Sequence, residues 1–336
     1  MVPLDYIFIL LALLGSLAIG GIYSTKMTDS KVMFVAGKRS SWWISGLSGY
    51  MTAFSAGTFV VWGGIAFRQG LVAVSILMSI GISLIFIGLY IAGRWRRLGV
   101  NSPAEYLGLR FGSVTVTLYS LIGMLGRGIS VAVALYSIAI IIVPLIPVPE
   151  SSFLFDPATG HISIKLAILI IGCTTIIYTV AGGLWAVLMT DVIQFLILSL
   201  MVLILVPLSL KSVGGISGFV ENVPDGFFHL AGGQYTFLWL IIWFASNFFL
   251  EGGDFAFVQR YLCVPDIRSA KKSAYLMAGL YLVSPILWML PAMAYRIVDP
   301  GANPEQAYIL AGQHLLPAGL LGLMVAAMFS ATASMV

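Results

Sequence analysis

Nine stretches of the chain are apolar over enough consecutive residues to cross a lipid bilayer. A helix needs about 20 residues to span the roughly 30 Å hydrocarbon layer. Lipid cannot form hydrogen bonds with exposed backbone polar groups, so only helices and closed β-barrels span a membrane. Barrel strands would be shorter and would alternate between apolar and polar residues, so we interpret all nine stretches as transmembrane helices. They cover residues 4–24, 43–66, 70–93, 113–146, 163–181, 184–210, 236–258, 270–296 and 315–336.

The composition excludes a soluble protein. Of the 336 residues, 60% are hydrophobic and only 9% are charged, whereas a soluble domain carries about 25% charged residues. The net charge of +4 gives no indication of a nucleic-acid partner, and two cysteines cannot form a disulfide framework. The first apolar stretch lacks the basic start of a cleavable signal peptide, so we expect it to remain in the mature protein as a transmembrane helix. The sequence therefore predicts one all-α, multi-pass domain over residues 1–336 that is embedded in the lipid bilayer. It does not indicate the oligomeric state.

Lysine and arginine are concentrated in three of the connecting loops, which alternate along the chain and therefore share one side of the membrane. Positive loops stay in the cytoplasm. We therefore expect an integral plasma-membrane protein whose N-terminus is extracellular or periplasmic. The basic residues are Lys26, Lys31, Lys38 and Arg39 in the first loop, Arg94, Arg96, Arg97 and Arg110 in the second, and Arg260, Arg268, Lys271 and Lys272 in the third.

Four ionisable residues remain at membrane depth after the loops are subtracted: Arg127, Asp191, Glu251 and Asp254. Placing such residues in lipid costs free energy, so they usually face a cavity or a partner. Arg127 admits two interpretations. A free guanidinium would bind a solute carboxylate in bidentate fashion, and the alternative is a buried pair with one of the acids.

Two apolar stretches contain candidate helix breaks. Gly252 and Gly253 separate Glu251 from Asp254, which predicts a broken helix or, alternatively, a kink or helix end. Residues 55–64 are also rich in small side chains, but such residues more often mark helix packing. Taken alone, this second segment favours the packing interpretation.

Motifs typical of enzymes are absent from the sequence. It contains no HExxH, GxSxG, Walker or CxxC pattern, and its three histidines fall in loops or at the edges of the apolar stretches. We therefore expect no enzyme activity.

Residues 180–198 read VAGGLWAVLMTDVIQFLIL and combine a glycine pair with Thr190, Asp191 and Gln194. This pattern resembles the signature of the sodium:solute symporter family. Four further stretches resemble family segments in the same order, and in the third of them Phe255 replaces the usual glutamine. They are FSAGTFVVWGGIAFRQGL (54–71), SPAEYLGLRFG (102–112), GGDFAFVQRYL (252–262) and AAMFSATASMV (326–336).

The resemblance implies a LeuT-type fold of two inverted five-helix repeats. Residues 4–24 would be an extra N-terminal helix, 43–210 the first repeat, and 236–336 part of the second. Family members continue for several more helices, so the resemblance also implies a C-terminal truncation inside the second repeat.

The resemblance also implies sodium sites. Sodium is here a co-transported ion, not a prosthetic group. One site would use backbone carbonyls of Ala56, Phe59 and Ala327 with the hydroxyl of Ser330, and a further sodium would lie between Asp191, Ser330 and Ser334. Ala331 stands where the family usually has a second hydroxyl, which Thr332 or water would have to replace.

For the solute, the resemblance places a site at mid-membrane between the two broken helices. We expect sodium-coupled import, by alternating access, of a small polar organic solute, and Arg127 favours one with a carboxylate, such as an acidic sugar or organic acid. The alternative is a transport-inactive membrane sensor or receptor of similar sequence. The residues expected at the solute site are Thr58, Gln69, Arg127, Glu251 and Asp254, with Trp62 and Phe67 as aromatic walls.

Overall fold

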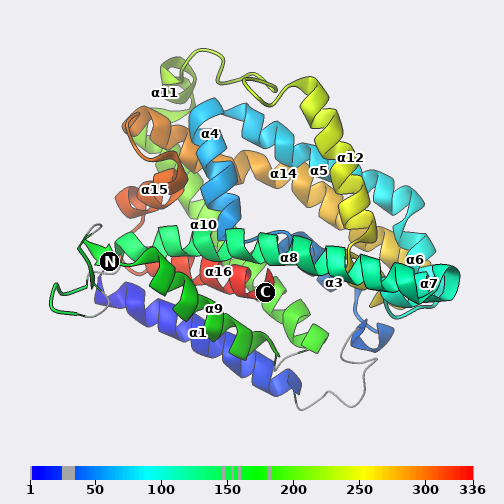
Figure 1. Cartoon of the computed structure of the whole chain (residues 1–336). Helices are drawn as coiled ribbons and strands as arrows, with labels where there is room; N and C mark the ends of the chain where they lie inside the picture. Colours follow the sequence, from blue (N-terminus) through cyan, green and yellow to red (C-terminus); the bar gives the residue numbers. More distant parts are fainter. Residues whose placement is uncertain are drawn as a thin grey trace.

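The computed structural model describes residues 2–24, 35–145, 148–152, 155–157, 160–180 and 183–335, and these are almost entirely helical (Figure 1). A two-residue hairpin of β1 (Phe155–Asp156) and β2 (His161–Ile162) lies in one connection. The helices are α1 (Pro3–Ser24), η1 (Ala36–Lys38), α3 (Trp42–Thr52), η2 (Thr58–Trp62), α4 (Gly63–Gln69), α5 (Leu71–Tyr90), α6 (Ala92–Leu98), α7 (Pro103–Phe111), α8 (Ser113–Ile142), η3 (Val143–Leu145), α9 (Ile164–Val180), α10 (Gly183–Ser212), α11 (Gly215–Asn222), α12 (Phe237–Gly253), α13 (Phe255–Leu262), α14 (Ile267–Val298), η4 (Pro304–Gln306), α15 (Ala307–Leu315) and α16 (Leu320–Met335).

The predicted stretch 43–66 is not one continuous helix. It divides into α3, a π-helical turn (η2) and α4, with a non-helical segment after Thr52. Local bonds explain the break, since the Gly57 N–H donates to Ser55 Oγ at 3.1 Å and the Ser55 N–H donates to Thr58 Oγ1 at 3.3 Å. Side chains that bond the nearby backbone compete with the helix ladder. The interpretation of this segment as a packing surface alone was therefore wrong.

The predicted stretch 236–258 is broken as well, and it extends further than predicted. Its two helices, α12 and α13, meet at an angle of 57° and end at Leu262. Asp254 lies at the bend with an extended backbone and caps α13 by accepting the Ala256 N–H at 3.0 Å. An aspartate is a favourable N-cap, so the glycine pair and Asp254 together begin a new helix rather than bend an old one.

Within the described residues, four helices are long and apolar enough to span a membrane: α5, α8 with η3, α10 and α14. The bent pair of α12 and α13 makes a fifth if it counts as one span. The structure thus supports a multi-pass membrane protein, while the number of nine spans stays a prediction.

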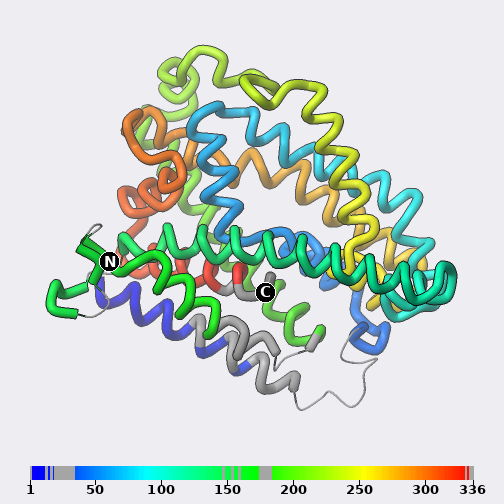
Figure 2. The backbone as a smooth tube through the Cα atoms, in the orientation of Figure 1, coloured from blue at the N-terminus to red at the C-terminus, as the bar shows by residue number. Residues whose placement is uncertain are grey.

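Two groups of helices are visible in Figure 1. Helices α5, α12 and α14 run together on one side, α1, α9 and α16 lie on the other, and α8 crosses the front. The tube in Figure 2 makes the course of α8 easy to follow, and α16 contacts both α1 and α8. Helix α14 packs most extensively against α5 and also contacts α3, α4 and α10, so it is the central element of the bundle.

Asp5 joins α1 to the beginning of α16. Its carboxylate is only 2% exposed and accepts the backbone N–H groups of Gly319 at 2.8 Å and Gly322 at 2.9 Å. Gly319 has a φ of +87°, and a Cβ on Gly322 would overlap the Asp5 backbone. Both glycines therefore permit the close approach. Asp5, which lies near the start of the predicted stretch 4–24 but was not counted among the ionisable residues at membrane depth, supplies the N-terminal cap of α16 from another helix.

Replacing Asp5 with alanine should lower the thermal stability of the purified protein. The change leaves two buried N–H groups at the start of α16 without an acceptor, which costs roughly 1–3 kcal/mol. The matched control is Asp225→Ala, because Asp225 is an exposed acid in the connection between α11 and α12. Equal melting temperatures for the two variants in detergent would contradict the assigned role of Asp5.

Candidate functional site

A cavity of about 580 Å³ lies between the two broken helices. Its lining comes from the end of α3, η2, α5, α8, the end of α12, α13 and α14. Seven of the lining residues are aromatic, and three are charged. A largely apolar cavity with a few converging polar groups is the usual form of a small-molecule site.

Four of the five residues expected at the solute site line this cavity: Thr58, Arg127, Glu251 and Asp254. Gln69 does not, because α4 carries it away from the break, to a position beside Gly233.

The two expected aromatic walls also separate. Trp62 lines the cavity, whereas the buried Phe67 ring lies elsewhere, 5.2 Å below the guanidinium carbon of Arg296.

Arg127 and Asp254 form an ion pair in the wall of the cavity. Arg127 Nη2 lies 2.6 Å from Asp254 Oδ1, and the two side chains are 31% and 20% exposed. Of the two interpretations of Arg127, the pair with an acid is therefore the one observed. The contact uses one guanidinium nitrogen of Arg127, and Asp254 also caps α13.

The break between α12 and α13 frees two carbonyl groups that distant side chains satisfy. Trp95 Nε1 donates to the carbonyl of Gly252 at 2.8 Å, and the Tyr119 hydroxyl donates to the carbonyl of Gly253 at 3.0 Å. Protein groups therefore compensate this break without a ligand, as a helix interrupted in lipid requires.

Glu251 differs from the other two charged residues of the cavity. It is 1% exposed, and within the part of the chain that the structure describes it makes no hydrogen bond or ion pair. A buried carboxylate without a partner is costly, so this side chain is the least satisfied group of the site.

The expected sodium residues lie at the other break. Ala56, Phe59 and Ala327 are all buried. The Ala56 N–H donates to Thr332 Oγ1 at 3.0 Å, which brings α16 against the break. The side chains of Ser330 and Ser334 lie outside the described part of the chain, so the sodium sites remain predictions.

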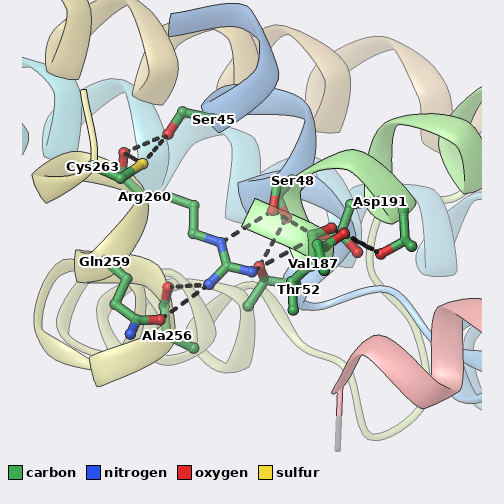
Figure 3. Close-up of polar contacts among 11 residues, drawn as sticks. Ser45, Ser48, Thr52, Val187, Asp191, Ala256, Gln259, Arg260 and Cys263 are labelled. Carbon is green, nitrogen blue, oxygen red and sulfur yellow. Dashed lines mark hydrogen bonds and ion pairs between the residues drawn. The ribbon is translucent and has the colours of Figure 1, made fainter. Parts of the chain in front are cut away.

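Asp191, the possible ligand of a further sodium, is buried beside Arg260 (Figure 3). Arg260 Nη2 lies 3.6 Å from Asp191 Oδ2, and the Ser48 hydroxyl donates to the same oxygen at 2.5 Å. Arg260 Nε donates in turn to Ser48 Oγ at 3.2 Å. Three elements, α3, α10 and α13, therefore share one buried polar cluster.

Counting Arg260 among the cytoplasmic loop charges was wrong. It lies in α13 and is 4% exposed, with Nη1 donating to the Ala256 carbonyl at 3.1 Å. Its apolar neighbours Val258 and Leu262 were the available signal, since a charge inside an apolar helix usually faces a partner.

Removing only one partner of the Arg260–Asp191 pair should lower the thermal stability of the protein more than removing both partners. Arg260→Gln leaves the buried Asp191 carboxylate without this cation, and breaking a buried ion pair from one side costs about 3–5 kcal/mol. The double variant with Asp191→Asn should recover part of this loss, because neither charge remains. Thermal melting of the four proteins in the cycle measures the coupling, and Arg268→Gln at an exposed arginine is the control. Strictly additive losses would contradict a direct interaction.

Comparison with known proteins gives a consistent result. The model of the sodium:solute symporter family matches residues 33–336. The sodium/myo-inositol cotransporter 2 of Bos taurus is 28% identical over 98% of this chain and 53% of its own length. The sodium/sialic acid symporter NanT of Aliivibrio fischeri is 28% identical over 98% of this chain and 66% of its own length.

A solved structure described as the substrate-bound outward-open state of a Na⁺-coupled sialic acid symporter has the same fold. It superposes with a TM-score of 0.81 at 24% identity, covering 99% of this chain and 70% of that chain. The chain spans about half the length of the cotransporters it matches. With nearly all of the sequence covered by the family model, the chain belongs to the sodium:solute symporter family.

Proposed function

We propose that this protein is a sodium-coupled secondary active transporter that imports a small polar organic solute by alternating access. The observation that carries the proposal is the cavity of about 580 Å³ between two interrupted helices, in a chain that belongs to a family of sodium-coupled transporters. Interrupted helices that enclose a site at mid-membrane are typical of transporters with inverted repeats.

In this proposal, residues 43–210 form the first five-helix repeat and residues 236–336 form part of the second, with 4–24 as an additional helix. The chain crosses the membrane nine times, and its N-terminus is outside. The two broken segments would then occupy equivalent positions in the two repeats, as the first helix of each.

Sodium would bind where α16 meets the first break. The carbonyls of Ala56, Phe59 and Ala327 with the Ser330 hydroxyl would provide hard oxygen ligands, which such a cation prefers. The hydrogen bond from Ala56 to Thr332 supports this location, because it holds α16 against the broken segment. Asp191 with Ser334 is the proposed further site, in which sodium would compete with Arg260 for the carboxylate.

Coupling follows if sodium and solute favour the same conformation. Sodium bound at α16 would order the first broken helix, which also contributes Thr58 and Trp62 to the cavity. Binding energies linked in this way are reciprocal, so each ligand must raise the affinity for the other.

An inward sodium gradient should drive solute accumulation by proteoliposomes that contain the full-length protein. Compared with an equal potassium gradient, we expect severalfold greater uptake of at least one solute in a panel of neutral, acidic and cationic molecules, because in the proposed mechanism only inward movement of sodium drives accumulation. Ser330→Ala should raise the sodium concentration for half-maximal uptake.

The control for that substitution is Ser152→Ala, in the connection between α8 and α9. Solute binding without sodium-driven accumulation would instead favour a membrane sensor. If no solute of the panel binds and none accumulates with the sodium gradient, the transport proposal is contradicted for these solutes.

A further inference from the structure

Glu251 is placed to interact with whatever enters the cavity. It lines the cavity at the end of α12, and its Oε2 is enclosed without a hydrogen-bond partner among the described residues. Tyr281 lines the same cavity, and the Tyr261 hydroxyl is also buried and unpartnered in the described chain. An acceptor this deeply buried requires a donor, and no described residue provides one.

The ionisable groups of the cavity do not all have a partner. Its charged lining residues are one cation, Arg127, and two acids, Glu251 and Asp254. Arg127 is committed to Asp254 at 2.6 Å, so those two charges cancel. The third ionisable group, the carboxyl of Glu251, has no such partner in the described chain. Its ionised form would need a positively charged group beside it, because an unpaired carboxylate is costly in a buried site.

The aromatic side chains of the cavity favour the same partner. Trp62, Trp243 and Trp288 are among the seven aromatic residues of the lining. The Trp62 and Trp243 ring centroids lie 5.7 Å apart, and Trp243 is stacked on Trp239. The faces of such rings are electron-rich and attract cations, most strongly in the case of tryptophan.

We propose that the transported solute carries a positively charged nitrogen, as an amino sugar or a quaternary amine does, and that Glu251 binds this nitrogen against the aromatic wall. The proposal rests on the proposed transport function and narrows its solute from any small polar molecule to an organic cation. It differs from the carboxylate solute expected from Arg127, because Asp254 already neutralises that guanidinium. Glu251 is then the residue that determines specificity.

Pairs of molecules with the same shape and different charge test this proposal. Tryptophan fluorescence of the purified full-length protein in non-ionic detergent reports binding, because three tryptophans line the cavity. The pairs are choline with 3,3-dimethyl-1-butanol and glucosamine with glucose, and N-acetylneuraminate represents the acids. In at least one pair the cation should bind at least about tenfold more tightly than its neutral partner, the size of effect expected from a desolvated charge on an aromatic face.

Glu251→Gln should abolish this preference while it keeps the shape of the side chain. The matched control is Glu221→Gln, because Glu221 is an exposed acid on α11, outside the cavity. If Glu251→Gln does not fold, the affinities of the unmodified protein for the cation and the neutral molecule of each pair still test the proposal. Equal affinity within both pairs, or tighter binding of N-acetylneuraminate, would overturn the proposal.

The two proposals fail independently. Sodium-driven uptake of a neutral or acidic solute, with no preference for cations, would retain the transport function and overturn the cationic solute. A preference for cations that depends on Glu251, without sodium-driven uptake, would support the cationic site and remove the transport function.

Discussion

The structure depends on the need to satisfy every polar backbone group in a solvent that offers none. Two helices are interrupted within the bundle, and each interruption frees N–H and carbonyl groups that a continuous helix would have paired. Side chains from distant segments replace the missing bonds: Trp95 and Tyr119 serve the break at Gly252 and Gly253, and Thr332 serves the break at Ala56. Each broken helix is consequently tied to other helices, and the breaks themselves organise the tertiary structure.

The same requirement explains where the buried charges lie. Asp254 neutralises Arg127 and caps α13, and Asp191 lies against Arg260 with Ser48 between them. Asp5 has no basic partner among the described residues and instead accepts backbone N–H groups at the start of α16. Glu251 is the exception, because the described part of the chain gives it no partner. In a protein that compensates its other buried acids, an uncompensated one inside a cavity indicates a ligand.

The sequence predicted the helices better than it predicted their connections through space. Each apolar stretch corresponds to one or more helices, because hydropathy over 20 residues is a local property. The break near Ser55 was missed when its residues were taken alone, since small side chains serve both packing and interruption and packing is the more common of the two. Arg260 was assigned to a loop because a hydropathy pattern treats every charge as solvated, and its partner Asp191 is far away in sequence. For Arg127, the sequence limited the partners to a few acids, and only the packing of α8 against the bend selected Asp254.

Helix α13 links the two charged clusters. It has only eight residues, begins with Asp254 as its cap, and carries Arg260 near its other end. Asp254 contacts α8 at the cavity, and Arg260 contacts α10 and α3 at the buried cluster. If α13 moves as a rigid unit, a displacement that separates Asp254 from Arg127 also changes the distance between Arg260 and Asp191. In the proposed transport function, α13 is therefore the element through which an ion near Asp191 and a solute in the cavity would influence each other.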